Sequence, residues 1–191
     1  KKIIIPKEHN FFPRKKIVIC GGHLTPALAV VNLLKKEDWE IIFIGRKFAL
    51  EGEKNLSVEY KTTREMGLPF ISLTAGRLQR SLTRFTFFSL LKVPIGFAQS
   101  FYWLRKLKPG IILSFGGYVA LPVAFAGWLL GIPVVTHEQS VVLGLANKII
   151  GFFAKKICVS WEKTMEIRSG KFVLTGNPIR KEIFKKFPIH N

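Results

Sequence analysis

The stretch VICGGHLTPALAVV, from Val18 to Val31, joins an apolar run, a pair of glycines, a histidine and a helix-forming run. β-Branched residues followed by glycine indicate a buried strand that ends in a tight turn. The small apolar residues after the turn favour an amphipathic helix. The stretch therefore predicts a strand–turn–helix unit with His23 at the start of the helix. An imidazole there can cap the helix, pack against it, bind an anion or move a proton.

The same unit recurs along the chain, because short β-branched runs alternate with helical runs. Strands are predicted at 15–20, 39–45, 68–74, 110–115, 132–138, 155–160 and 171–176. Apolar strands separated by helices are typical of a parallel sheet covered on both faces. The predicted fold is therefore α/β, a Rossmann-like doubly wound parallel sheet over residues 16–177. Residues 1–15 are predicted to form a basic N-terminal extension, and 178–191 the start of an interdomain linker.

The segment from Ile111 to Thr136 contains no charged residue and is long enough to span a bilayer. Glycines and prolines interrupt it at six positions, and both of its ends carry β-branched residues. This pattern favours a buried strand–turn–helix–strand unit over a transmembrane helix.

Composition narrows the class of protein. Hydrophobic residues make up 48% of the 191 residues, which excludes disorder as the default and allows one domain with a sizeable core. Lys and Arg number 30 against 12 Asp and Glu, a formal charge of +18. Such an excess predicts an anionic partner: nucleic acid, an anionic membrane surface or a phosphorylated ligand. No nucleic-acid-reading motif is recognisable, so we expect no nucleic-acid partner. Cys20 and Cys158 lie in strand-like runs, which favours free thiols in a reducing compartment.

Three predicted turns carry glycine or polar residues where strands end, the place at which parallel sheets bind ligands. They are CGGH at 20–23, FGGY at 115–118 and THEQS at 136–140. Two glycine pairs on neighbouring strands would form backbone cradles for a diphosphate. The alternatives are a tight turn with a solvated histidine and, for THEQS, a hydrogen-bonded network that fixes the loop. No metal site is predicted, because the histidines lack ligand spacing and no cysteine cluster exists.

Cations alternate with apolar side chains in the segment from Ala75 to Lys108. An exposed apolar patch bordered by cations is typical of an interfacial membrane segment. The predicted membrane patch consists of Arg77, Leu78, Arg80, Leu82, Arg84, Phe85, Phe87 and Phe88. The alternative, that the aromatic rings belong to the core, is favoured for the part of the helix after Pro94.

The motifs GGHLTPALAV, KPGIILSFGGYVALP, GIPVVTHEQSVVLGLANKII and LTGNPIR together resemble the N-terminal half of the MurG family, glycosyltransferase family 28. The resemblance extends from Lys16 to Arg180 and implies one half of a GT-B glycosyltransferase, whose two Rossmann-like domains face each other across a cleft. It implies transfer of GlcNAc from UDP-GlcNAc to the C4 hydroxyl of lipid-linked MurNAc-peptide (lipid I), with inversion and without cofactor or metal. The donor would be held mainly by a C-terminal domain outside this sequence.

The resemblance also implies a place and partners. Members act as peripheral proteins on the cytoplasmic face of the bacterial plasma membrane, where anionic lipids would attract this basic chain. The alternative is a non-catalytic, membrane-docked acceptor-binding subunit of a split glycosyltransferase.

Site residues follow from the same resemblance. The acceptor diphosphate would be held by Gly21, Gly22, Gly116, Gly117 and Tyr118. His23 would be the catalytic base or a diphosphate ligand, with Glu138 as the second candidate base. Contacts to the donor or the sugar would come from Cys20, Gly21, Gly22, Ser140, Asn147 and Arg180. Two departures stand out: the usual GGTGGH loop is reduced to CGGH, and HEQN becomes HEQS, so that Ser140 offers one donor instead of two.

Overall fold

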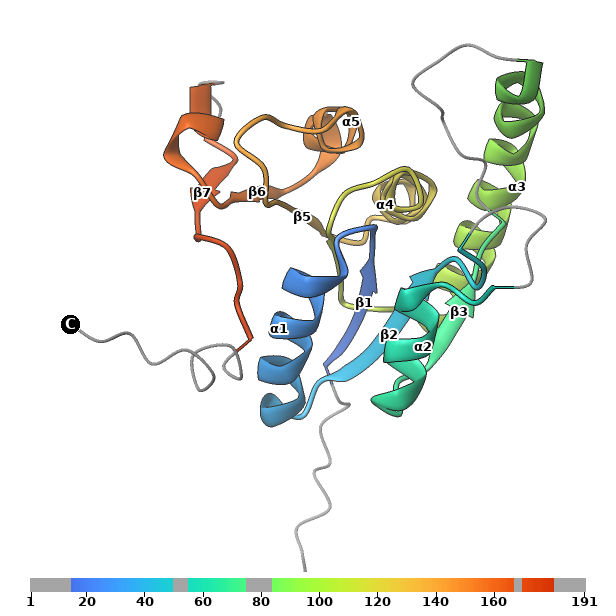
Figure 1. Cartoon of the computed structure of the whole chain (residues 1–191), viewed down its shortest axis with the longest axis horizontal. Coiled ribbons are helices and arrows are strands. Elements are labelled where there is room, and N and C mark those ends of the chain that lie inside the picture. Colours follow the sequence, from blue (N-terminus) through green and yellow to red (C-terminus); the bar gives the residue numbers. More distant parts are fainter. Residues whose placement is uncertain (1–14, 50–54, 75–83, 167–169, 181–191) are drawn as a thin grey trace, which may run out of the picture.

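A computed structural model describes residues 15–49, 55–74, 84–166 and 170–180, which form one seven-stranded sheet with helices on both faces (Figure 1). The strands are β1 (Lys16–Cys20), β2 (Glu40–Gly45), β3 (Phe70–Ser72), β4 (Ile111–Ser114), β5 (Val134–Glu138), β6 (Lys156–Val159) and β7 (Phe172–Leu174). The helices are α1 (Leu24–Leu34), α2 (Val58–Glu65), α3 (Arg84–Leu107), α4 (Ala120–Leu129) and α5 (Leu145–Phe153), with short 3₁₀ helices η1 (Lys35–Glu37) and η2 (Glu162–Glu166).

The strand order is β3-β2-β1-β4-β5-β6-β7, and every neighbouring pair is parallel. The predicted doubly wound sheet is therefore confirmed, and each predicted strand is present. The direction of winding reverses between β1 and β4, which lie side by side in the centre of the sheet. Sheets of this topology bind ligands in the crevice at this switch point, outside the carboxyl ends of the strands.

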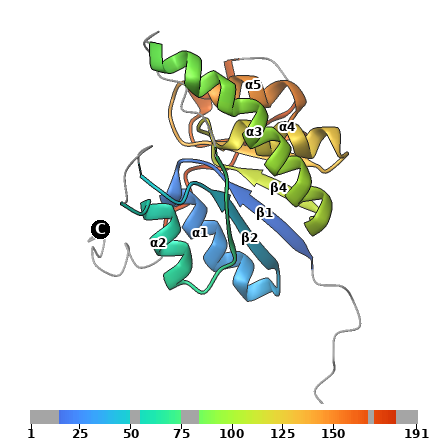
Figure 2. The same ribbon diagram turned by 90° about the vertical axis from the view of Figure 1, so that its right-hand side faces the viewer.

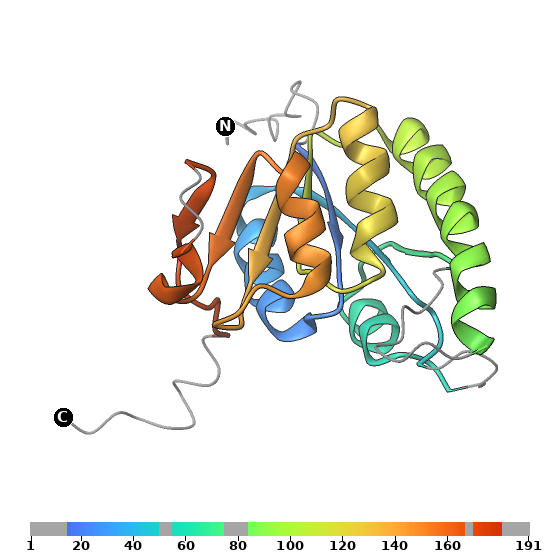
Figure 3. The same cartoon turned by 90° about the horizontal axis from the view of Figure 1, so that it is seen from above.

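Two helical layers enclose the sheet, with α1 and α2 on one face and α3, α4 and α5 on the other (Figures 2 and 3). Successive residues of a strand point to opposite faces. Ile19 of β1 accordingly packs with Val31 of α1, whereas Val18 belongs to the core that Val123 of α4 and Ile150 of α5 complete. Burial on both faces explains why β1 is apolar from Ile17 to Cys20.

The uncharged segment from Ile111 to Thr136 folds as β4, α4 and the start of β5. The predicted strand–turn–helix–strand unit is thus confirmed. Within the described ranges, no helix combines the length and the apolar character that crossing a membrane requires.

Two glycines permit the close approach of the loops that follow β1 and β4. Gly21 has a φ of +129°, and a Cβ there would lie 2.7 Å from the backbone of Phe115. Gly116 has a φ of +68°, and its Cβ would lie 2.9 Å from Nδ2 of Asn147. A side chain at either position would therefore be strained in conformation and would collide with a neighbour. The first contact lies between the two glycine loops above the switch point, and the second lies between the loop after β4 and helix α5.

Candidate functional site

The loops after β1 and β4 are joined directly. Cys20 and Ser114 are partners in the parallel register, and the amide of Gly22 donates to the carbonyl of Gly116 at 3.0 Å. The amide of Gly116 in turn donates to Oγ of Ser114 at 3.2 Å. The expectation that the two glycine turns lie side by side is met. The amides of Gly22 and Gly116 are engaged within the loops, however, so fewer amides face a ligand than four glycines imply.

Helices α1 and α4 begin directly after these loops and lack a side-chain cap. Their N-cap residues, His23 and Val119, make no side-chain hydrogen bond to the first turn. In contrast, α2 is capped by Ser57, whose Oγ accepts from the amide of Tyr60 at 3.1 Å. Uncapped first-turn amides and the helix dipole attract anions. Both helices therefore present their positive ends at the switch point, and His23 does not act as a side-chain cap.

The ring of His23 contacts a residue far away in sequence. Its Nδ1 lies 2.7 Å from Nε2 of Gln139, in the loop after β5. An amide nitrogen only donates, so Nδ1 accepts and the neutral ring carries its proton on Nε2. In this tautomer His23 donates a hydrogen bond to an anion and has no lone pair left to take a proton from a substrate. Of its two predicted roles, the geometry favours diphosphate ligand over general base.

Arg46 is a site residue that the sequence reasoning missed. A small cavity of about 30 Å³ lies beside the glycine loops, and Arg46 lines it together with Glu59, Gly117 and Tyr118. The guanidinium lies 4.9 Å from the centre of the Tyr118 ring, within cation–π range. The signal was available, because Arg46 directly follows the last residue of β2 and so lies at the ligand-binding edge.

Glu138 and Asn147 lie behind the glycine loops and not in the open crevice. The Glu138 carboxylate is 2% exposed, and it accepts at 2.9 Å from the Ser140 amide, the Gly144 amide and Asn147 Nδ2. Oδ1 of Asn147 accepts from Oγ1 of Thr136 at 2.7 Å. Both side chains are thus occupied by hydrogen bonds within the protein, and the roles of Glu138 as a base and of Asn147 as a sugar contact remain predictions. The alternative interpretation, a network that fixes the loop, describes the geometry.

The protonation of Glu138 follows from the same contacts. Burial alone raises the pKa of its carboxyl. Hydrogen bonds from Gly144, Ser140 and Asn147 outweigh that effect, so the pKa lies below its ordinary value. Glu138 is therefore an ionised anchor at neutral pH.

The side chain of Cys20 does not reach the crevice, and its contact to the donor or the sugar remains a prediction. Its side chain is fully buried in the core that α4 and α5 cover, and burial raises the pKa of the thiol to about 12. Both Cys20 and Cys158 are free thiols. Ser140 and Arg180 are exposed, Ser140 after β5 and Arg180 at the end of the last described range. Their donor-side roles remain predictions.

His137 forms a hydrogen bond to the segment that follows β7. It is buried, and burial lowers its pKa more than the hydrogen bond to Gly176 and the nearby Glu138 raise it. The neutral ring lies with Nε2 3.2 Å from the carbonyl of Gly176, so Nε2–H donates there. The strand β5 thus holds Gly176, near the end of the predicted domain and before the predicted linker at 178–191.

The membrane patch lies mostly outside the described structure. Arg77, Leu78, Arg80 and Leu82 fall between the described ranges, and for Arg84, Phe85, Phe87 and Phe88 only the helical backbone of α3 is described. The patch remains a prediction. Across the described ranges, no three His, Cys, Asp or Glu side chains gather as metal ligands.

Comparison with known proteins adds a family match. The model of the glycosyltransferase family 28 N-terminal domain matches residues 20–159. A UDP-N-acetylglucosamine–N-acetylmuramyl-(pentapeptide) pyrophosphoryl-undecaprenol N-acetylglucosamine transferase of Bacillus cereus is 36% identical over 176 residues, covering 90% of this chain and 48% of the relative. A protein of the same name from Caldicellulosiruptor saccharolyticus is 41% identical over 168 residues, covering 86% and 43%. The chain thus spans about half the length of the curated relatives that it matches.

Solved structures share the fold. MurG of Acinetobacter baumannii superposes with a TM-score of 0.69 at 24% identity, covering 89% of this chain and 47% of that one. A UDP-GlcNAc 2-epimerase of Neisseria meningitidis gives a TM-score of 0.59 at 12% identity, covering 92% and 55%. At these identities the superpositions show the architecture alone.

Because the ionised Glu138 carboxylate accepts three hydrogen bonds, we predict that Glu138→Gln lowers the free energy of unfolding by an amount that depends on pH. Glutamine cannot accept from all three donors, so we expect the free energy of unfolding to fall by about 1–3 kcal/mol at neutral pH. Because the folded pKa is depressed, the stabilisation is complete above the ordinary carboxyl value of about 4.3 and is lost as pH falls through the folded pKa. Urea unfolding of both proteins at several pH values measures this gap. If the difference in unfolding free energy between the two proteins stayed constant as the pH falls, the role of ionised Glu138 as a hydrogen-bond acceptor would be contradicted.

The contact between His23 and Gln139 predicts a tautomer. Imidazole nitrogen NMR shifts of the neutral His23 ring should show the proton on Nε2, because Gln139 donates to Nδ1. In Gln139→Leu that preference should disappear, whereas Gln99→Leu, at a distant glutamine on α3, should leave it unchanged. A proton found on Nδ1 in the unaltered protein would restore His23 as a candidate base.

Proposed function

This chain belongs to the glycosyltransferase family 28 N-terminal domain, and from that premise we propose that it binds the diphosphate of a lipid-linked acceptor during GlcNAc transfer. The resemblance stated from the sequence motifs is confirmed by the family match and by the relatives. The names of those relatives describe the transfer of N-acetylglucosamine to a pyrophosphoryl-undecaprenol acceptor. The proposal brings that activity to this chain as the acceptor-binding half, with UDP-GlcNAc held mainly by a second domain.

One observation carries the proposal: two uncapped helices start at the switch point from glycine loops that are bonded to each other. Pro26 and Pro122 contribute no amide, and the Ala120 amide donates to Gly117, so the remaining first-turn amides and the helix dipoles supply the partial positive charge. The Arg46 guanidinium, in the cavity that Gly117 also lines, adds a full charge. His23 adds a donor through Nε2–H. A diphosphate, with its adjacent negative groups, matches two converging helix N-termini better than a single carboxylate does.

The proposed chemistry is a direct displacement. The C4 hydroxyl of the acceptor sugar attacks the anomeric carbon of GlcNAc, and the bond from that carbon to the UDP oxygen breaks with inversion. UDP leaves with the bonding electron pair, and the hydroxyl proton passes to a base. We assign no described residue to that base, because Nδ1 of His23 accepts from Gln139 and Glu138 is buried. Helix N-termini and cations, without a metal, would stabilise the charge that develops on the leaving diphosphate.

We further propose that the chain docks on the anionic cytoplasmic face of the bacterial plasma membrane. The formal charge of +18 supports this, because basic residues near an anionic surface are attracted to it. The predicted patch at 77–88 would supply the apolar contact. Docking would place the switch point near a lipid-linked substrate.

The binding proposal predicts an effect of Arg46→Gln on pyrophosphate. Removing a charge-assisted contact of about 1.5–3 kcal/mol should weaken pyrophosphate binding at least tenfold. Lys36→Gln is the matched control, because it removes the same charge from an exposed position in η1, beyond the C-terminal end of α1. Calorimetric titration at low and moderate salt measures both variants. If both substitutions weakened pyrophosphate binding equally, the binding would depend only on net charge, contrary to the proposal.

A further inference from the structure

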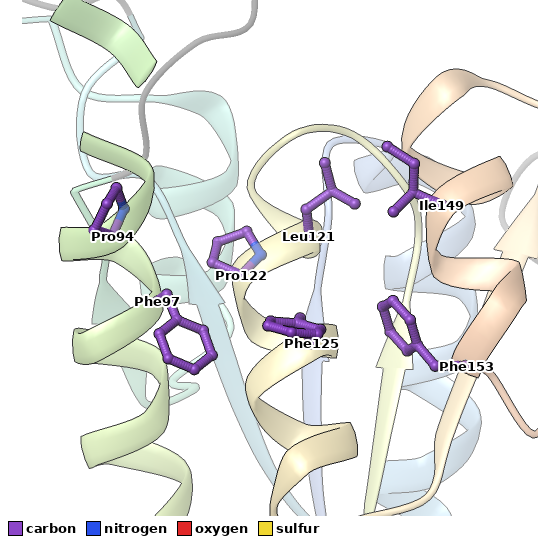
Figure 4. Close-up of a pocket in the computed structure, with 7 residues that line it drawn as sticks. All are labelled: Pro94, Phe97, Leu121, Pro122, Phe125, Ile149 and Phe153. Atoms are coloured by element: carbon purple, nitrogen blue, oxygen red, sulfur yellow. The ribbon is translucent and has the colours of Figure 1, made fainter. Parts of the chain in front are cut away.

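An apolar groove crosses the outer surface of the layer formed by α3, α4 and α5 (Figure 4). Its volume is about 480 Å³, within the range of small-molecule pockets. The lining contains only apolar side chains: Pro94, Phe97, Leu121, Pro122, Phe125, Ile149 and Phe153. The site described above does not use any of them.

Aromatic rings form the floor of this groove. The ring centre of Phe125 lies 5.5 Å from that of Phe97 on α3 and 5.9 Å from that of Phe153 on α5. Phe125 nevertheless remains 42% exposed, and Ile149 on the rim is 40% exposed. Rings that are held together yet open to water form a preshaped apolar surface, which marks a binding site for hydrocarbon.

The groove begins at the same edge of the sheet as the glycine loops. Leu121 lies in the first turn of α4, four residues after Gly117, which corresponds to roughly one helical turn, ~5 Å. On α5, Ile149 lies two residues after Asn147, which is less than one helical turn, and the Asn147 amide lies against Gly116. Figure 4 shows Pro94, Leu121 and Ile149 near one end of the groove, with the phenylalanine rings farther along the helices.

We propose that this groove binds the isoprenoid units next to the diphosphate of the acceptor lipid; this rests on the proposed function. In a polyprenyl diphosphate the hydrocarbon chain is bonded directly to the phosphate. If the diphosphate lies at the glycine loops, the first isoprenoid unit therefore lies within roughly 5 Å of them, the length of one helical turn. Among the described residues, the lining of the groove provides an apolar surface at that distance. Phospholipid acyl chains lack a diphosphate that would occupy the adjacent loops. The groove thus sets the chemical class of acceptor that the site selects.

The test compares ligands that share the diphosphate. Inorganic pyrophosphate, farnesyl diphosphate and a linear alkyl diphosphate of equal carbon number are titrated into the chain below their micellar concentrations. We expect farnesyl diphosphate to bind at least tenfold more tightly than pyrophosphate. It should also bind more tightly than the linear ligand, because double bonds leave fewer conformations to lose on binding.

Substitutions in the groove should remove this gain selectively. In Phe125→Ser and in Ile149→Gln the affinity for farnesyl diphosphate should fall to within about threefold of that for pyrophosphate, whose own affinity stays unchanged. Phe152→Ser is the matched control, because that ring is 83% exposed on α5 and lies outside the lining. Thermal melting checks that each variant folds, and Ile149→Gln keeps the test open if Phe125→Ser does not fold.

The outcomes separate the two proposals. Pyrophosphate binding without any gain for farnesyl diphosphate overturns the groove and leaves the proposed function standing. A gain that the linear ligand matches, or that Phe152→Ser loses equally, overturns the isoprenoid assignment in favour of a general lipid-facing surface. If neither pyrophosphate nor farnesyl diphosphate binds, the proposed function fails and this inference fails with it.

Discussion

The hydrogen bond from the Gly22 amide to the Gly116 carbonyl holds two loops together at the point where the winding of the sheet reverses. Gly21 and Gly117 favour this contact, because both adopt positive φ angles and neither places a Cβ between the loops. Once the loops meet, α1 and α4 start next to each other with their positive ends at one crevice. The geometry of the anion site is therefore a consequence of backbone packing, and the side chains add to it.

A buried polar network supports this pair of loops from behind. Ser114 accepts from the Gly116 amide, Thr136 bonds to both Ser114 and Asn147, and Asn147 reaches the Glu138 carboxylate. Within such a network each hydrogen bond is strengthened by the low local dielectric, and each unsatisfied group would be costly. Glu138 then fixes the loop after β5 through the amides of Ser140 and Gly144. That loop carries Gln139, which sets the proton position on His23.

The sequence predicted the fold and the place where the two glycine turns meet, because both depend on local signals. Apolar runs and glycine pairs locate strands and turns, and a parallel sheet brings the ends of its strands to one edge. The sequence did not reveal which polar side chains face the crevice. Glu138 and Asn147 were predicted as ligands, yet their partners in the structure are backbone groups, Thr136 and each other, and no spacing pattern predicts these contacts. The pairing of His23 with Gln139 and the approach of Arg46 to Tyr118 depend likewise on loop conformation.

The central claim is that the switch point between β1 and β4 is an anion site for diphosphate. Backbone amide NMR during a pyrophosphate titration tests it most directly. The account predicts that the largest shifts map to the glycine loops and to the first turns of α1 and α4, with the opposite edge of the sheet unaffected. Shifts spread evenly over the basic surface, or confined to residues away from these loops, would contradict it.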